Sequence, residues 1–308
     1  MNNKHEIRIE QNRPERLELL RAQRLFYGRA KKYQALFTLL ALLLPAIGVI
    51  FGASYPEIRP FLGLGSILVV LIEVGIISRG QKEDCKRAAR IQEQFDTEVL
   101  SLEWNQLVAG KRVDAEDLRE IATGPIPEGE RRRLVDWYEP VISRLPLELG
   151  RLICQRTNLA YDMRVRKQYA AILIWTAVLL FVGLALVGLW QGLTWRELIL
   201  TMGVPVLPLA AYVLREHRKQ HDTIETLTTL KSEQEKMWEK ALAGASSEEL
   251  AVMSRNLQDA IYRHRASNPL VFDWLYARLR AKEEGLTRHA VEKLVEQAER
   301  KLNLAEVK

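Results

Sequence analysis

The sequence has very little cysteine: Cys85 and Cys154 are the only two among 308 residues. They stand far apart and form no CxxC pair, so the chain carries neither a disulfide framework nor zinc-ligand spacing, and we expect two free thiols in a reducing compartment. Enzyme motifs are missing as well, because no P-loop, GxSxG or HExxH is present and Gly63-Leu-Gly65 falls inside an apolar run. We therefore expect neither an enzyme nor a bound cofactor.

Acidic side chains are nearly missing from four long apolar blocks, which occupy residues 34–54, 60–78, 169–193 and 198–214. Glu73 is the one acid among them. The first block has 21 residues, and a helix rising about 1.5 Å per residue would make it about 32 Å long, enough to cross a bilayer core. We predict four transmembrane helices. Because very short loops join the first block to the second and the third to the fourth, we predict two tight hairpins.

Basic side chains are distributed unevenly around these blocks. Twenty Lys and Arg residues occur in the four long flanks, whereas the two short loops contain only Arg59 and Arg196. The flanks counted are 16–33, 79–94, 151–168 and 215–231. The positive-inside rule therefore places both hairpin loops outside and both termini in the cytosol. The net charge of +6 then indicates contact with the lipid bilayer, whose inner leaflet is anionic, and we expect no nucleic acid polymer as partner.

No segment alternates apolar and polar residues as a strand does, so we predict an all-α membrane protein. Its expected parts are a basic N-terminal helix, a first hairpin, a cytosolic helical module, a second hairpin and a C-terminal helical module. Their ranges are 1–33, 34–78, 79–168, 169–214 and 215–308. Two apolar stripes at helical spacing support the modules: Ile91, Phe95, Val99 and Leu102 form one, and Ala290, Val291, Leu294, Val295 and Ala298 form the other.

The two halves of the sequence share landmarks in the same order. Residues 104–110 and 238–244 both run from Trp to Gly and are predicted to end a helix, because glycine suits the left-handed position there. A helix start follows in each half, at 114–117 and at 246–249, and an Asp-Trp pair lies further along. The spacing near 134 residues predicts an internal duplication. Coincidence among helical membrane sequences is the alternative.

Polar, proline and glycine residues inside the blocks are candidates for a pore or gate. Glu73 could line a polar path or pair with a basic residue near the inner interface. Three prolines free backbone carbonyls and permit bending, although prolines are also common in membrane spans without such a role. These are Pro45, Pro205 and Pro208. A GxxxG pair, Gly48 and Gly52, allows close helix packing.

The densest polar cluster outside the blocks lies between residues 261 and 274. Arg263 and Arg265 could bind a phosphate while neighbouring aromatic rings stack on a base. Alternatively, the arginines could face lipid headgroups and the aromatic side chains could form a small core. The ligand or partner candidates are Tyr262, Arg263, His264, Arg265, Asp273 and Trp274. His217 and His221 stand at i, i+4, but the cations beside them disfavour a metal ion, so we predict no metal site.

Three tracts of the chain resemble a known family. They are PERLELLRAQRLFYGRAKKYQ near the start, NLAYDMRVRKQY before the third block and IYRHRASNPLVFDWLY near the end. They are similar to the S-4TM proteins, the SMODS-associated four-transmembrane effectors, over nearly the whole chain. The resemblance implies a pore-forming effector of a bacterial anti-phage system, located in the inner membrane and controlled by a cyclic nucleotide made on infection. It implies no catalytic residues.

Four helices in two hairpins would fill their own centre with side chains, so a conducting path requires several chains and we expect a homo-oligomer. A cyclic nucleotide or a signalling partner protein would favour the open assembly. The alternative is a non-conducting membrane scaffold or sensor, which uses the same hairpins as anchors and the cytosolic helices for partners. The mostly apolar composition of the four blocks suits this alternative equally well.

Overall fold

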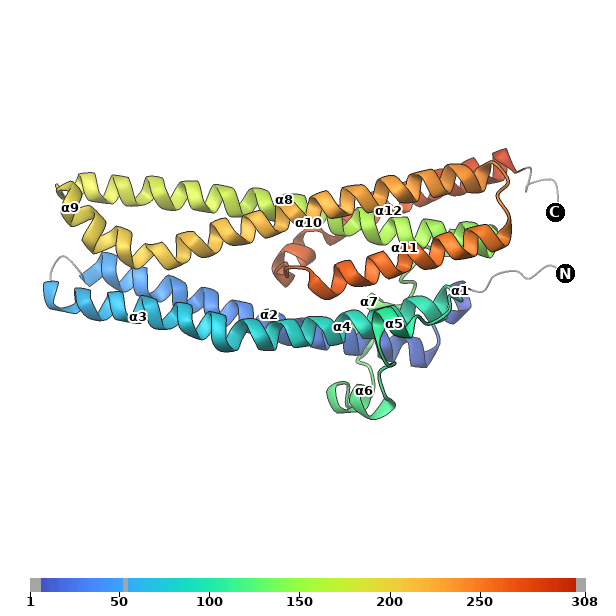
Figure 1. The fold of residues 1–308 in the computed structure, drawn as a ribbon, viewed down its shortest axis with the longest axis horizontal. Coiled ribbons are helices and arrows are strands. Elements are labelled where there is room, and N and C mark those ends of the chain that lie inside the picture. The colour runs from blue at the N-terminus through green and yellow to red at the C-terminus, as the bar shows by residue number, and fades with distance from the viewer. Residues whose placement is uncertain (1–6, 52–54, 303–308) are drawn as a thin grey trace.

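The computed structural model describes residues 7–51 and 55–302, and none of these residues lies in a β-strand. The all-α prediction is confirmed. Four long helical runs make up most of the molecule (Figure 1). The first two are α2 (Pro14–Phe51) and the run α3 (Arg59–Ile72), η2 (Glu73–Ile77) and α4 (Ser78–Val99). The others are α8 (Leu147–Trp190) and the run α9 (Trp195–Leu198), η4 (Ile199–Gly203) and α10 (Val204–Leu242).

Shorter helices complete the end of the molecule opposite α9. They are α1 (Ile7–Glu10), α5 (Gln106–Ala109), α6 (Ala115–Ile121), α7 (Glu128–Leu134), α11 (Ser247–Ser267) and α12 (Asp273–Lys301). Of two 3₁₀ turns, η1 (Pro56–Ile58) lies between α2 and α3, and η3 (Pro140–Arg144) lies between α7 and α8. α1 and the end of α12 lie at this same end, so the first and the last described helix are on one side of the bundle (Figure 1).

The four long runs pair as two helical hairpins, α2 with α3–α4 and α8 with α10 (Figure 1). The expected segment boundaries at 33/34, 78/79, 168/169 and 214/215 all fall inside continuous helix. Each apolar block therefore continues without a break into a charged stem.

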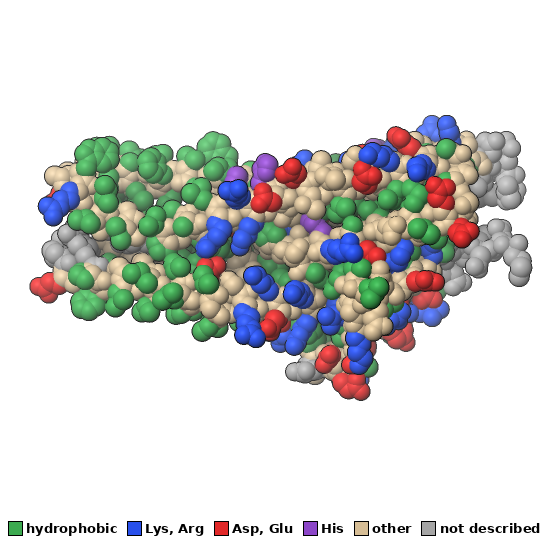
Figure 2. Space-filling view, in the orientation of Figure 1, with side chains coloured by type: hydrophobic (Ala, Val, Ile, Leu, Met, Phe, Trp, Pro, Cys, Tyr) green, Lys and Arg blue, Asp and Glu red, His purple; other side chains and the backbone are tan. Residues whose placement is uncertain are grey.

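One end of the molecule is apolar at its surface (Figure 2). Large hydrophobic side chains point outward there, for example Phe61, Phe181 and Leu189, whose exposed fractions are 74%, 75% and 78%. Such a wide apolar surface is typical of contact with lipid. Three helices of the described chain are long and apolar enough to cross a membrane. They are Pro14–Gly48, Pro60–Val99 and Leu147–Trp190.

The fourth predicted span, 198–214, is helical throughout but is not among these three. It is divided among α9, the π-helical turn η4 and the start of α10, and α10 then continues into a charged stem. The described residues thus contain three candidate spans and a shorter apolar helical segment that is paired with the third.

Buried side chains fill the bundle where the apolar end borders the charged stems. Phe37, Leu173 and Leu209 belong to one buried cluster and are 2%, 7% and 5% exposed. The Phe37 ring packs edge-on against Tyr212, with the ring centroids 4.9 Å apart. The helices of a single chain are therefore packed together through apolar side chains at this level.

The charged end has a separate apolar core, and both predicted stripes contribute to it. Ile91, Phe95 and Val99 are fully buried, and Val291 and Val295 lie in the same cluster. The two cysteines, both buried and free, lie in this end. Helices from the beginning, middle and end of the chain therefore fold into one body, which we call the charged body (residues 7–33, 79–168 and 215–302).

The landmarks of the proposed duplication differ in local structure. Gly110 and Gly244 both adopt a positive φ, of 75° and 92°, as predicted for a residue that follows a helix. However, Trp238 lies in the last turns of the long helix α10, whereas Trp104 precedes the four-residue helix α5. Ser246 accepts a hydrogen bond from the Glu249 backbone N–H at 3.2 Å. The Asp114 side chain caps no backbone N–H of α6. The duplication stays a prediction from the sequence.

Candidate functional site

Glu73, the one acid of the apolar blocks, lies where the two hairpins meet. Its Oε2 accepts a hydrogen bond from Nη2 of Arg215 at 3.3 Å. The Glu73 side chain is 12% exposed and that of Arg215 is 43% exposed. Glu73 belongs to the first hairpin and Arg215 to the second, so this ion pair connects the hairpins at the border between apolar and charged surface. Of the two roles considered for Glu73, the structure shows pairing with a basic residue.

A π-helical turn carries Glu73, because η2 begins at this residue and ends at Ile77. A second π turn, η4, occupies Ile199–Gly203 in the other hairpin. A π turn inserts one extra residue into the helix, rotates the side chains that follow and is frequent at functional sites. Sequence periodicity did not reveal either turn, since both lie in stretches that are mostly apolar and have no distinct polar face.

The predicted prolines and glycines are dispersed along the hairpins. Pro208 lies inside α10 and is half-buried. Pro45 and Pro205 lie within the helical backbone of α2 and α10. Gly48 is buried in α2, whereas Gly52 lies outside the described residues. None of the prolines interrupts the described part of its helix, and they belong to both hairpins: Pro45 to the first, Pro205 and Pro208 to the second.

A layer of buried polar side chains, at the border between the apolar end and the charged body, was not predicted from the sequence. Gln34 of α2 donates a hydrogen bond from Nε2 to the Tyr212 hydroxyl at 3.0 Å. One turn further along α10, Glu216 is 5% exposed and its Oε1 accepts from Gln220 Nε2 at 2.9 Å. Burial raises the pKa of Glu216, and the Gln220 hydrogen bond opposes that rise. The i, i+4, i+8 spacing of Tyr212, Glu216 and Gln220 was the signal that could have identified this layer.

The predicted cluster at 261–274 does not form one pocket. Tyr262 is 7% exposed and packs in a small apolar cluster, while Arg263 is exposed on the next position of α11. His264 contacts Asp162 through Nε2 at 3.2 Å. Asp273 pairs with Lys31 of α2. Trp274 is 53% exposed.

Arg265 turns inward and binds the fully buried carboxylate of Asp96. Burial alone would lower the pKa of Arg265, but the Asp96 carboxylate raises it above its usual value. Asp96 also accepts a hydrogen bond from the Tyr138 hydroxyl at 2.6 Å. Burial raises the pKa of Tyr138 well above its usual value, and the Asp96 charge raises it further. The Arg265 guanidinium is therefore engaged inside the protein.

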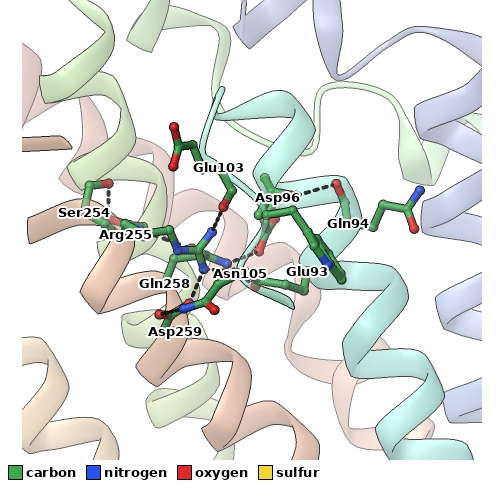
Figure 3. Close-up of polar contacts among 12 residues, drawn as sticks. Glu93, Gln94, Asp96, Glu103, Asn105, Ser254, Arg255, Gln258 and Asp259 are labelled. Atoms are coloured by element: carbon green, nitrogen blue, oxygen red, sulfur yellow. Dashed lines mark hydrogen bonds and ion pairs between the residues drawn. The ribbon is translucent and has the colours of Figure 1, made fainter. Parts of the chain in front are cut away.

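A polar network surrounds this pair and joins α4 to α11 (Figure 3). Glu93, in the charged stem beyond the apolar block, binds Nη2 of Arg255 at 2.6 Å and Nε2 of Gln258 at 2.8 Å. Asn105 donates to Asp259 at 2.7 Å. Burial raises the pKa of Glu93 to about 7, although both hydrogen bonds oppose the rise. The network links the first half of the chain to the second through buried charges.

A second group of contacts joins the stem of α8 to the turn between α11 and α12. Arg166 donates from Nη1 to Gln220 Oε1 and to the Pro269 carbonyl oxygen, both at 2.8 Å. Arg164 binds the buried Glu283 of α12. Among the described residues, no group of three or more His, Cys, Asp or Glu side chains could hold a metal ion. These contacts join helices together and place no nucleophile beside a base.

Comparison with known proteins gives the chain a family. Residues 5–294 match the SMODS-associating 4TM effector domain. The chain is also similar to a protein named probable CBASS effector molecule in Bacillus cereus (strain VD146), with 27% identity over 280 residues. That alignment covers 86% of this chain and 90% of the relative. No solved structure matches. Because the match spans nearly the whole sequence, the chain belongs to the SMODS-associating 4TM effector domain family.

Proposed function

We propose that this protein is a membrane-permeabilising effector of a bacterial anti-phage system. Its four apolar segments cross the inner membrane as two hairpins, with the charged body and both termini in the cytosol. A cyclic nucleotide or a signalling partner protein opens it after infection, and the infected cell then dies or stops growing. The family and the name of the Bacillus cereus relative support the defence role.

The main observation in support of this mechanism is that the contacts between the hairpins differ between the charged body and the apolar end. In the charged body, buried ion pairs such as Asp96–Arg265 join the halves. At the border of the apolar end, the Glu73–Arg215 ion pair joins the hairpins, and its arginine is partly exposed. Apolar contacts inside lipid are exchanged for lipid contacts at little cost. The hairpins can therefore separate within the membrane while the body stays folded.

In the observed arrangement of one chain, side chains fill the bundle near the border of the apolar end, among them Phe37, Leu173 and Leu209. Conduction therefore needs the hairpins to part and several chains to assemble around a common path. A signal can drive this change only if it binds the open arrangement more tightly than the closed one. The charged body is the place for that signal to act, since it holds both halves.

A membrane-potential dye tests the proposal in cells. The full chain is expressed with and without a co-expressed cyclic-nucleotide synthase, and the dye reports polarisation of the inner membrane. We expect depolarisation and growth arrest only when both are present. The purified protein in dye-loaded liposomes should then release the dye when the synthase product is added.

Preserved polarisation and intact liposomes under the same conditions would contradict permeabilisation. They would favour the non-conducting scaffold or sensor. In that case, crosslinking should still detect a signal-dependent partner at the charged body.

A further inference from the structure

The turn between α11 and α12 lies between the two hairpins, where the apolar end meets the charged stems (Figure 1). Residues 268–272 of this turn belong to no helix. We call residues 269–279, from the turn through the first two turns of α12, the wedge. Its side chains Leu270, Val271 and Leu275 are buried. A segment buried between two hairpins must separate from at least one of them before the hairpins can part.

The second hairpin binds the backbone of the wedge. Nη1 of Arg166, on the stem of α8, donates a hydrogen bond to the carbonyl oxygen of Pro269 at 2.8 Å. Nε2 of Gln220, on the stem of α10, donates to the carbonyl oxygen of Leu270 at 3.3 Å. Both donor side chains are buried, and a buried hydrogen-bonding group is costly to leave without its partner. The wedge is therefore firmly attached to α8 and α10.

The first hairpin contacts the wedge through side chains. Leu270 packs in one small cluster with Ala30 of α2 and Cys85 of α4. Asp273 forms an ion pair with Lys31 of α2. The Asp273 side chain is 72% exposed, and an ion pair that is open to solvent contributes little to stability. Neither contact includes a buried hydrogen bond, so the first hairpin binds the wedge less specifically than the second hairpin does.

The wedge also completes the apolar cluster at this border. Val271 and Leu275 belong to the same cluster as Phe37 of α2. The Phe272 ring packs edge-on against Tyr169 of α8, with the ring centroids 6.2 Å apart. Removing these side chains from a packed cluster leaves a void, which destabilises the arrangement around it. The closed arrangement of the hairpins therefore depends on a segment from the last part of the chain.

We propose that the wedge is an autoinhibitory contact, which holds the two hairpins closed at rest and is withdrawn from α2 and α4 on activation. The inference rests on the proposed permeabilising function and names the element that prevents permeabilisation at rest. Arg265, near the end of α11, binds Asp96 of α4, and the non-helical residues 268–272 follow this anchor. The wedge can therefore leave the first hairpin while α11 stays attached to the charged body.

The native cysteines report the position of the wedge. Cys85 is 5% exposed and packs with Leu270. Burial raises the pKa of the Cys85 thiol to about 12, so this thiol should react slowly while the wedge is in place. Cys154 is fully buried in the core of the charged body and reports unfolding of that body. Labelling of the full chain in lipid nanodiscs with a maleimide, measured for each cysteine by mass spectrometry, separates movement of the wedge from loss of folding.

A substitution at Leu270 tests the apolar part of the contact. Leu270→Ala removes a side chain that packs on Cys85, and the labelling rate of Cys85 should rise about tenfold, because local opening becomes less costly. Leu257→Ala is the matched control, since Leu257 is a buried leucine of α11 in a cluster that contains neither Cys85 nor the wedge. This control should label at Cys85 as slowly as the wild type.

A substitution at Asp273 tests the charged part with less risk to folding. Asp273→Lys places two cations together at the solvent-exposed pair with Lys31, and the labelling rate of Cys85 should rise about twofold to fivefold. Glu225→Lys makes the same change of charge at an exposed position of α10 and should leave the rate unchanged. If Leu270→Ala also exposes Cys154, Asp273→Lys decides. The inference is overturned if the wedge variants that keep Cys154 protected label Cys85 no faster than their controls.

Dye release from liposomes without any signal connects the wedge to the proposed function. Leu270→Ala should release the dye several-fold faster than Leu257→Ala. If the wild type releases dye with the synthase product, but Leu270→Ala without it releases no more than Leu257→Ala, the autoinhibitory role is wrong and the function stands.

The opposite outcome is also distinguishable. If no chain releases dye under any condition, but the synthase product speeds the labelling of Cys85 in the wild type, permeabilisation fails and the wedge stands as the segment that the signal withdraws. No dye release together with unchanged labelling of Cys85 would overturn both.

Discussion

The two ends of this molecule are built from the same long helices but are held together in different ways. In the charged body, carboxylates such as Glu93 and Asp96 are 2% and 0% exposed and are bound by arginines from the other half of the chain. In the apolar end, the outward side chains are hydrophobic, and Glu73–Arg215 at its border links the hairpins. The stability of the body depends on specific buried ion pairs, whereas the apolar end depends on an apolar environment around its exposed hydrophobic side chains.

This difference has a mechanical consequence. A buried ion pair is costly to break because each charge is left without a partner in a dry environment. Apolar side chains in lipid lose little when they exchange one apolar neighbour for another. In the proposed function, the body therefore keeps the two halves together while the hairpins change their arrangement within the membrane. The substitutions described below test this difference between the charged body and the apolar end.

The largest effect is expected from Asp96→Ala, in the centre of the body. The substitution leaves Arg265 and Tyr138 buried without their carboxylate partner. Breaking a buried ion pair in this way costs about 3–5 kcal/mol. Thermal or denaturant unfolding of the protein in detergent measures the loss. Glu248→Ala, an exposed acid in the first turn of α11, is the control and should change stability by less than about 0.5 kcal/mol.

The second-largest effect is expected from a leucine-to-lysine substitution, which we compare between the apolar end and the charged body. Leu179 in α8 is 69% exposed and Leu107 in α5 is 99% exposed. Leu179→Lys places a charge toward lipid and should cost about 2.5–3.5 kcal/mol of membrane insertion. Leu107→Lys replaces one exposed residue by another in water and should have no measurable cost. The membrane-integrated fraction after alkaline extraction checks both, and an equal effect of the two variants would contradict the lipid-facing assignment.

The third effect is a pH dependence of the body. The pKa of Glu93 in the folded chain, about 7, lies above that of an unfolded glutamate. The folded state therefore takes up this proton first, and stability is gained as the pH falls through 7. Between pH 8 and pH 6 the gain should be about 1 kcal/mol. Unfolding curves at both pH values measure it, and Glu93→Gln should reduce the difference while other groups keep theirs.

The smallest effect on stability is expected at the link between hairpins. Glu73→Lys places two cations together, and because Arg215 is partly exposed the change in unfolding free energy should stay below about 1 kcal/mol. Leakage without any signal should nevertheless rise several-fold, since even such a small change shifts a two-state equilibrium. Dye release from liposomes measures this leakage.

Two further variants test whether that leakage comes from loss of the Glu73–Arg215 pair. The exchanged pair Glu73→Arg with Arg215→Glu should restore a closed state. Arg79→Glu is the control, because Arg79 lies at a similar level but pairs with Glu83 of its own helix. Leakage from this control equal to that of Glu73→Lys would show that local charge, and not the link between hairpins, is responsible.

Much of the fold followed from local sequence. The apolar blocks, the helical class and the buried stripes at Ile91 and Val291 are set by side chains close together in the chain. Helix continuity through the block boundaries was missed, because a change of polarity along a helix does not break its backbone. The pairing of Glu73 with Arg215 spans 142 positions, and no local pattern specifies it.

The sequence by itself determined which segments can enter a membrane and which must stay in water, because that choice depends on the composition of each helix. Only the tertiary structure decided which charges meet. It placed Arg265 on the buried Asp96 and left Arg263, two positions earlier on the same helix, exposed, although both arginines are equally basic in the sequence. The physical reason is that a charge is neutralised by its neighbours in space, and those come from elements far apart along the chain.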